Sequence, residues 1–239
     1  MRKPSFKIYA SRWHLGVTLT VIILPFLFFL VFSRIAHITT RTLALHLLIS
    51  FLRLFTAYII AVLLAWIAAI AFYRGRRAAI ALPIFDVLQS FPTFAALPLA
   101  ALFWGKSNFT VIFFLVITII WPIFFSTISS LKLMKRDWGE AVEISGLKGI
   151  DYLWNFLLPV TIPGLITGSI IGLGEGWEAL VATEIIVGMR SGLGNFFQSF
   201  SGDTAVTAFG ILGLLILIFT INKLVWLPLL EWSHWREEE

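Results

Sequence analysis

The residue types that carry out enzyme chemistry occur in this sequence, but their spacing does not form a known catalytic pattern. Gly105-Lys106-Ser107 looks like the end of a phosphate-binding loop, which also needs a glycine five residues before Gly105, and that position is Ala100. Residues 188–192 read Gly-Met-Arg-Ser-Gly rather than the Gly-x-Ser-x-Gly of a hydrolase. The histidines lack the spacing of metal ligands, and cysteine is absent from the sequence. We therefore expect no catalytic residue, cofactor site or metal site in this chain, and no enzyme activity.

A charge inside an apolar segment is costly, so such residues are the next candidates for function. Asp86 is the single charge in the otherwise apolar run 78–104. It either lines a pathway, or pairs with Arg53, or lies near the cytoplasmic interface about three turns after Arg77. Arg190 either attracts an anion at the outer mouth of a pathway or is a solvated loop charge.

Two acidic residues lie in and after a glycine-rich stretch further along the chain. Glu178 and Glu184 would point about 240° apart on a regular helix, so they line one surface only if the helix is broken. The glycines of segment 172–176 favour such a break. The four-residue spacing of Gly168 and Gly172, in contrast, is typical of close helix packing.

Prolines are concentrated in the middle of the chain. Pro83, Pro92 and Pro98 lie in the same run as Asp86, and Pro122 lies in the next apolar run. Proline bends a helix and frees carbonyl groups that neighbouring helices must satisfy. We therefore expect bent helices around a pathway, whose candidate residues are Asp86, Pro92, Pro98, Glu178, Glu184 and Arg190.

The composition indicates what kind of element positions these residues. Of 239 residues, 59% are hydrophobic and only 13% are charged, and the mean hydropathy is +0.93. A soluble fold of this length cannot cover its surface with so few charges, so the chain is expected in a membrane. The net charge is +5, but Lys and Arg lie between apolar stretches rather than on one basic face, which argues against a nucleic-acid partner.

Six apolar segments approach the 20 or so residues that a helix needs to cross a bilayer. The sequence therefore predicts an all-α, polytopic membrane protein in which a single transmembrane domain, residues 15–230, lies between cytoplasmic ends at 1–14 and 231–239. Its expected spans are Leu15–Phe32, Leu54–Tyr73 with a helix that starts near Leu43, Ala78–Trp104, Ser107–Leu131, Tyr152–Gly174 and Thr204–Asn222.

Positive charges set the orientation, because Lys and Arg are retained in the cytoplasm. With the N-terminus inside, four basic residues lie outside, namely Arg34, Arg41, Lys106 and Arg190. Twelve lie inside, namely Arg2, Lys3, Lys7, Arg12, Arg74, Arg76, Arg77, Lys132, Lys135, Arg136, Lys148 and Arg236. Both termini are therefore expected in the cytoplasm of a cell with this protein in its inner (plasma) membrane.

The connection between the fourth and fifth spans, within 132–158, is the longest internal one. Asp137 and Glu140 resemble a capping box that would start a short helix, and Gly146 would end it. A second helix would then begin at Gly149 and run toward Leu158. Such a pair of helices either docks into a partner protein or lies as an amphipathic connector on the bilayer surface.

This loop carries a resemblance to a known family. Glu140-Ala141-Val142, then Gly146, then Phe156-Leu157-Leu158-Pro159 resembles the Glu-Ala-Ala…Gly…Ile-x-Leu-Pro loop of the membrane subunits of binding-protein-dependent ABC importers. In that family the loop sits in a groove of a cytosolic ATPase. The resemblance implies that Glu140, Ala141, Gly146, Leu158 and Pro159 transmit nucleotide-driven motion to the spans.

Other segments are similar to one branch of that family, the nitrate, sulfonate and taurine type. Pro92 to Leu99 resembles its Pro-x-x-Ala-x-x-Pro-Leu segment, and Ser50 with Arg53 resembles its Ser-Leu-x-Arg sequence. Trp177, Glu184 and Gly192-Leu193-Gly194 resemble its Trp…Ala-Glu…Gly-Leu-Gly run. The similarity covers roughly residues 43–227, and Glu178 departs from it by standing where a small hydroxyl residue is common.

The resemblance implies a type I importer permease fold and a permease subunit that carries a small polar or anionic solute. It also implies the partners: a second permease copy in a homodimer, two ATPase subunits that bind ATP and Mg, and an extracytoplasmic solute-binding protein. Two alternatives remain at this point. One is a secondary carrier or small channel driven by ion gradients through Asp86, Glu178 and Glu184, and the other is a scaffold that recruits a soluble protein without transport.

Overall fold

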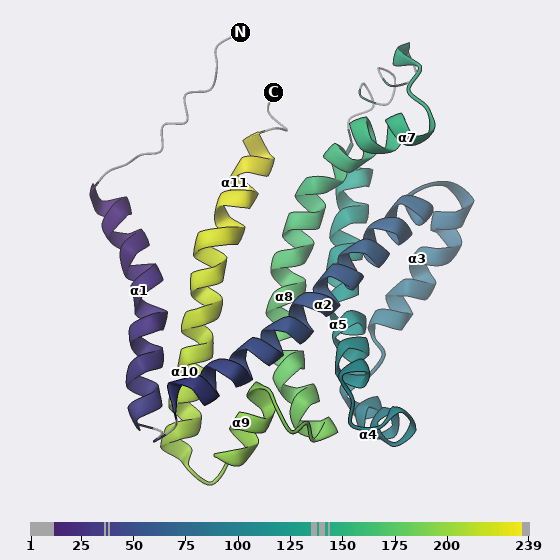
Figure 1. Cartoon of the computed structure of the whole chain (residues 1–239). Coiled ribbons are helices and arrows are strands. Elements are labelled where there is room, and N and C mark those ends of the chain that lie inside the picture. Colours follow the sequence, from purple (N-terminus) through teal and green to yellow (C-terminus); the bar gives the residue numbers. More distant parts are fainter. Residues whose placement is uncertain are drawn as a thin grey trace.

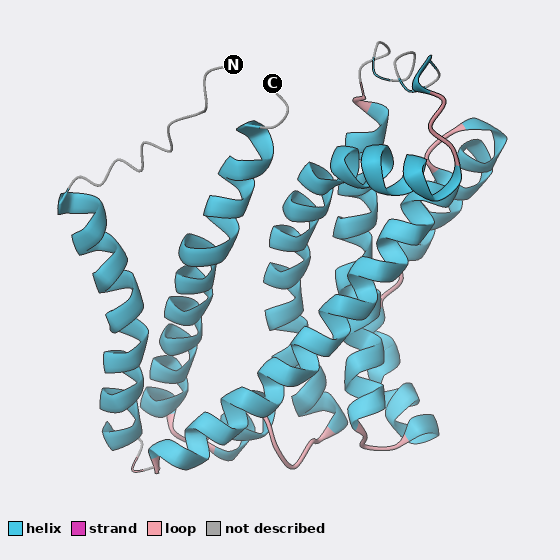
Figure 2. Cartoon of the chain, turned by 45° about the horizontal axis from the view of Figure 1, so that its top comes forward, coloured by secondary structure: helices cyan, strands magenta, loops and turns pink. Residues whose placement is uncertain are grey.

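The computed structural model describes residues 12–35, 37, 39–134, 138, 142 and 144–235. Within these residues the regular structure is entirely helical, with no strand, which confirms the expected all-α class (Figure 2). The helices run up and down between two ends of the molecule, and the start of α1 and the end of α11 lie at the same end, which we call the terminal end (Figure 1). This is the arrangement that an even number of membrane crossings would give.

The described helices have the following bounds. They are α1 Arg12–Ile35, α2 Thr40–Phe72, α3 Gly75–Gln89, α4 Thr93–Trp104, α5 Asn108–Lys132, α7 Gly149–Tyr152, the π-helical turn η1 Leu153–Leu157, α8 Leu158–Val187, α9 Leu193–Ser199, α10 Thr204–Ile221, the π-helical turn η2 Asn222–Trp226 and α11 Leu227–Trp235. The helices α7, η1 and α8 form one continuous helical segment, and so do α10, η2 and α11.

Four helical segments of the described chain are long and apolar enough to cross a membrane: Thr40–Phe72, Asn108–Lys132, Gly149–Val187 and Thr204–Leu230. The pair α3 and α4 makes a fifth if it is counted as one span. The first predicted span, Leu15–Phe32, lies within α1, a helix of 24 residues. All six predicted segments are therefore helical, but they are not all simple spans.

The third predicted segment, Ala78–Trp104, is not one straight helix. It consists of α3 and α4, which are bent by 80° relative to each other. Pro92 has no N–H to donate and disfavours a helical conformation at Phe91, so the helix ends before it. The next helix restarts on the Pro92 carbonyl, which accepts hydrogen bonds from the N–H groups of Ala95 and Ala96 at 3.0 and 3.3 Å.

The fifth predicted span also differs from the structure. It was expected to end at Gly174, with a break in the glycine-rich stretch, but the helix continues without a break to Val187. It therefore carries Glu175, Glu178 and Glu184 within it. The predicted glycine break is wrong because most of these glycines serve close packing instead.

Every fourth residue of α8 from Gly164 to Gly176 is a glycine, and this row faces α5. A Cβ added to Gly168 would lie 2.5 Å from Cα of Ile123 on α5. Gly174 lies on another face, where an added Cβ would meet no atom within 4 Å. The packing role predicted for Gly168 and Gly172 is thus confirmed, since small residues let backbones approach in a membrane.

A matching row of alanines lies on α2. Ala57, Ala61, Ala65 and Ala69 are fully buried and recur every four residues. The helix α5 contacts both α2 and α8, and its residues Leu115, Ile119 and Ile123 are fully buried between them. The opposite face of α2 exposes large apolar side chains such as Leu63 and Ile67, as expected of a surface in contact with lipid.

The two π-helical turns share a cause. The turn η1 ends at Leu157 and η2 at Trp226, each two residues before a proline, Pro159 and Pro228. The proline ring clashes with the carbonyl four residues earlier and offers it no N–H. A wider i to i+5 hydrogen-bond register makes room for the ring. Both helices therefore continue through a proline instead of ending there.

Replacing Gly168 by alanine should destabilise the chain by about 1–3 kcal/mol, because the new methyl group must displace the α5 backbone at Ile123. The control Gly174→Ala adds the same methyl group in open space, and it should be neutral or stabilising by up to about 1 kcal/mol. Thermal unfolding of the two purified variants in detergent compares them. Equal stability would contradict the close α5–α8 contact.

Candidate functional site

An ion pair between Arg53 on α2 and Glu184 on α8 lies inside the protein. The Arg53 Nη1 atom is 2.6 Å from Glu184 Oε1, and the two side chains are only 5% and 0% exposed. The hypothesis that Asp86 pairs with Arg53 is therefore wrong. Asp86 lies exposed on α3, where its carboxylate accepts a hydrogen bond of 2.7 Å from Gln89.

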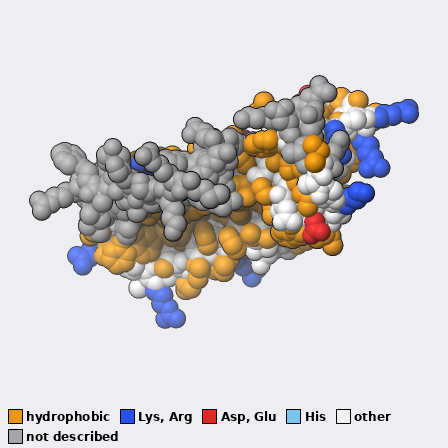
Figure 3. All heavy atoms as spheres, turned by 90° about the horizontal axis from the view of Figure 1, so that it is seen from above, with side chains coloured by type: hydrophobic (Ala, Val, Ile, Leu, Met, Phe, Trp, Pro, Cys, Tyr) orange, Lys and Arg blue, Asp and Glu red, His pale blue; other side chains and the backbone are white. Residues whose placement is uncertain are grey.

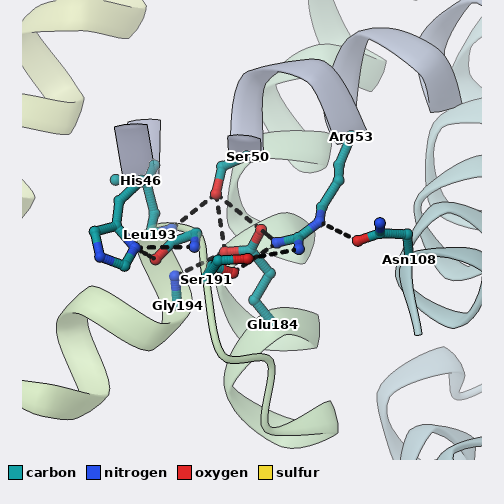
Figure 4. Close-up of polar contacts among 9 residues, drawn as sticks. His46, Ser50, Arg53, Asn108, Glu184, Ser191, Leu193 and Gly194 are labelled. Carbon is teal, nitrogen blue, oxygen red and sulfur yellow. Dashed lines mark hydrogen bonds and ion pairs between the residues drawn. The ribbon is translucent and has the colours of Figure 1, made fainter. Parts of the chain in front are cut away.

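The remaining polar atoms of this pair also have partners. The Ser50 hydroxyl donates to Glu184 Oε1 at 2.8 Å, and the Gly194 backbone N–H donates to Oε2 at 2.8 Å. Arg53 donates from Nε to the Asn108 side-chain oxygen at 2.9 Å and from Nη1 to the Ser191 carbonyl at 2.8 Å. Figure 4 shows these groups converging between the two helices. A buried pair with such partners avoids the cost of unpaired charges in an apolar interior.

The segment that follows α8 is shaped around this carboxylate. Gly192 has φ of +111°, and a Cβ there would collide with both carboxylate oxygens of Glu184. The next N–H, from Leu193, donates to the Ser50 hydroxyl at 2.7 Å. The ring atom Nδ1 of His46 lies 3.0 Å from both the N and O atoms of Gly192. Only glycine combines this backbone conformation with this lack of volume.

We call this set the buried polar cluster. It consists of His46, Ser50, Arg53, Asn108, Glu184, Ser191 and Gly192–Gly194. It joins α2, the first turn of α5, the end of α8 and the start of α9, at the end of the molecule opposite the termini (Figure 1). Because Glu184 is fully enclosed, its carboxylate holds these helices together and is not accessible to a solute.

A cavity of about 910 Å³ lies beside the break between α3 and α4. Its lining comes from the break, from α5 and from α8, and consists of Gln89, Ser90, Phe91, Pro92, Thr93, Phe94, Ala95, Ile117, Thr118, Trp121, Pro122, Phe125, Ser126, Ile171 and Glu175. A concave site of this volume, largely apolar and with a few polar groups, suits a small molecule. The cavity exists because the chain turns at Pro92 instead of running straight along α5.

The structure brings one of the six predicted pathway residues to this cavity, namely Pro92. Glu184 belongs to the buried polar cluster, and Asp86, Pro98, Glu178 and Arg190 are exposed outside the lining. Sequence reasoning missed Glu175 and Trp121 as lining residues. The signal for Glu175 was its place four residues after Ile171, which lies on the same face of α8.

Part of the predicted loop site can be described. Glu140 and Ala141 lie outside the described residues. Gly146 has φ of +69°, the left-handed conformation expected of a glycine that ends a helix, and Leu158 and Pro159 begin α8. The expected second helix begins at Gly149, as predicted, but it is continuous with the fifth span.

The start of this second helix contacts the end of α2. Tyr73, just after α2, hydrogen-bonds through its side chain to Tyr152 of α7, and the Arg74 guanidinium lies 5.0 Å from the centre of the Tyr73 ring. Burial, with the Tyr152 hydroxyl next to it, raises the pKa of Tyr73 to about 12. The tyrosine therefore stays neutral at physiological pH.

Removing one partner of the buried pair should destabilise the protein strongly. Glu184→Leu leaves Arg53 buried without its counter-charge, which should cost about 3–5 kcal/mol, and Arg53→Leu should cost a similar amount. The double variant should lose much less than the sum, because neither charge is then left alone. Thermal unfolding measures all three, with the exposed Arg190→Leu as a control of little effect. Additive losses in the double variant would contradict a direct pairing.

A comparison with known protein families matches most of this chain. Residues 61–225 match the model of the family described as "Binding-protein-dependent transport system inner membrane component". This range contains the α3–α4 break, the cavity lining, Glu184 and the Gly192–Gly194 segment.

Three relatives illustrate the similarity. The chain is 34% identical over 141 residues to the nitrate import permease protein NrtB of Leptolyngbya laminosa, an alignment that covers 56% of this chain and 50% of the relative. It is 32% identical over 143 residues to the taurine transport system permease protein TauC of Escherichia coli (strain K12), over 59% and 51% of the two chains. It is 28% identical over 141 residues to the bicarbonate transport system permease protein CmpB of Synechococcus elongatus, over 56% and 51%.

The chain thus spans about half the length of the curated relatives it matches. The family match itself covers more than half of this chain, from the middle of α2 to the end of η2. The chain therefore belongs to the family of inner-membrane components of binding-protein-dependent transport systems.

Proposed function

We propose that this chain is the permease subunit of an ABC importer, in which it forms the pathway for a small polar or anionic solute and couples transport to ATP hydrolysis by a separate subunit. The observation that carries the proposal is the cavity of about 910 Å³ beside the α3–α4 break, between helices that can span a membrane. The printed names of its relatives, which concern nitrate, taurine and bicarbonate transport, support the same function.

The pathway is proposed to form between two copies of the chain. One copy lines the cavity from three sides, with the α3–α4 break, α5 and α8. A second copy would close it, and a homodimer related by a two-fold axis would then place two such cavities around one central route. Alternating access would follow from the rocking of one copy against the other.

The proposed orientation places the terminal end in the cytoplasm. Arg74, Arg76 and Arg77 lie at this end, at the N-cap and in the first turn of α3, and Lys132 and Lys148 flank the loop after α5. In the view of Figure 3, which looks onto this end, several Lys and Arg side chains gather at the right-hand side. This distribution agrees with retention of positive charge in the cytoplasm. A solute-binding protein would then dock at the opposite end, near α4 and α9.

The ATPase is proposed to act on the loop before α7. The left-handed turn at Gly146 directs the chain into α7, and α7 continues through η1 and α8 as one helix as far as Val187. The same helix carries the cavity residue Glu175 and the ion-paired Glu184. A displacement of the loop by two ATPase subunits, which would bind ATP and Mg, would therefore reach the cavity through one continuous helical segment.

The identity of the partners tests this function directly. A pull-down of the tagged chain from its native membrane in mild detergent should recover an ATPase with a phosphate-binding loop, at two copies for each two copies of the permease. Mass spectrometry gives the identity and the stoichiometry. A chain that is recovered alone and moves solute under an ion gradient would instead support a secondary carrier.

Replacing Gly146 by valine should uncouple ATP hydrolysis from transport while the protein still inserts into the membrane. A β-branched residue is strained at φ of +69°, so the turn that leads into α7 would be distorted. The control Gly202→Val also adds a side chain in open space, but at a glycine without positive φ. ATP-driven uptake in proteoliposomes compares the two, and we expect a loss of at least about tenfold for Gly146→Val. Full uptake by this variant would refute the role of the loop.

A further inference from the structure

The cavity lining lacks the positive charge that a site for an inorganic anion would require. Among the residues that line it in the described part of the chain, Glu175 is the single ionisable one, and no Lys, Arg or His is present. Glu178 follows less than one turn later on α8 and interacts electrostatically with Glu175. The lining residue Gln89 is hydrogen-bonded to a further carboxylate, that of Asp86. The described lining and the two carboxylates that interact with it thus carry negative charge and no positive charge.

Arg53, the cation of the buried polar cluster, does not offset these charges. Arg53 is 5% exposed, and its guanidinium is already paired with Glu184 and bonded to Ser191 and Asn108. A carboxylate attracts a positive charge that enters beside it and repels a negative one. An anion in this cavity would therefore meet repulsion, whereas a positively charged group would be attracted.

Aromatic rings surround the same space from two sides. Phe91 and Phe94 come from the α3–α4 break and are 52% and 42% exposed, while Trp121 and Phe125 come from α5. Trp121 is braced from behind by Phe85, with ring centres 6.2 Å apart. Aromatic faces attract ammonium groups and other organic cations, and Trp does so most strongly. Aromatic rings with one carboxylate are the combination expected of a site for an organic cation.

We infer that this cavity is a solute site for a molecule with an ammonium or other organic cationic group, alone or within a zwitterion, and that it disfavours simple inorganic anions. The inference rests on the proposed function and narrows its solute class. Among the relatives, it separates this chain from those named for nitrate and bicarbonate, and it is compatible with an amine such as taurine. Hydroxyl groups of Ser90, Thr93 and Ser126 line the cavity and can serve the polar remainder of the solute.

The test uses the absence of native cysteine from the sequence. Thr118→Cys introduces one thiol into the cavity lining on α5, and Ser201→Cys introduces one in the exposed turn after α9. The full chain in nanodiscs, which leave both membrane faces accessible, is labelled with a cationic and an anionic methanethiosulfonate of similar size. The ratio of the two rates at Thr118→Cys, divided by the ratio at Ser201→Cys, measures the charge preference of the cavity.

We expect the cationic reagent to be preferred by roughly tenfold at Thr118→Cys, and Glu175→Gln in the same background to remove most of this preference. Tetramethylammonium should slow labelling of Thr118→Cys by a neutral methanethiosulfonate, and sodium nitrate should not. A preference for the anionic reagent would overturn the inference, and so would a preference that Glu175→Gln leaves unchanged. Absence of labelling at Thr118→Cys, with normal labelling at Ser201→Cys, would show that the cavity is closed to solutes and would overturn it as well.

This labelling needs neither an ATPase nor transport, so it separates the two proposals. A cation-selective cavity in a chain without an ATPase partner would refute the importer function and leave the charge preference standing. An ATPase partner together with an anion-selective cavity would refute the solute class alone.

Discussion

The ion pair between Arg53 and Glu184 is the constraint around which the rest of the chain is arranged. The two residues are 131 positions apart in sequence, yet their side chains meet at 2.6 Å in an apolar interior. Neither charge is tolerable there alone. The pairing therefore fixes α8 against α2, and the backbone of the Gly192–Gly194 segment must approach closely enough to complete the hydrogen bonds. The length of the fifth span follows from it, since α8 has to reach Glu184 before it ends.

Close packing of the helix surfaces, together with the ion pair, holds α2, α5 and α8 together. In lipid there is little hydrophobic gain when two apolar helices meet, so close approach and van der Waals contact have to hold them together. The alanine row of α2 and the glycine row of α8 provide this contact on two sides of α5. These three helices form the rigid part of the molecule. The broken pair α3 and α4 lies beside them, and the cavity lies where α3 ends and the chain turns.

Much of the fold was accessible from the sequence, because the length and hydropathy of a span depend on the residues of that span alone. The family resemblance also pointed to residues of the buried polar cluster. Its separate motifs contain Ser50, Arg53, Glu184 and Gly192–Gly194, and the structure brings these residues together. The partner of Arg53 could not be found by spacing, because the sequence does not say which helix faces α2. Asp86 is the partner considered for Arg53 from the sequence, and only the placement of the helices excludes it.

Glycine and proline were the residues whose effects were hardest to predict. The same glycine spacing allows a helix to break or to pack closely, and the presence of α5 decides between the two. Proline behaves similarly: Pro92 ends a helix, whereas Pro83, Pro98 and Pro122 lie inside helices. Glu175 escaped notice for a related reason, since its importance comes from the aromatic residues of other helices around it.

The continuous helix Gly149–Val187 has a mechanical consequence. Its middle part is held against the α5 backbone along Gly164–Gly176, so α8 cannot swing without α5. A force on the loop before α7 would therefore turn α2, α5 and α8 together, and the α5 and α8 walls of the cavity would move as one body relative to the α3–α4 break. The width of the cavity would then be set by the angle between that body and the break.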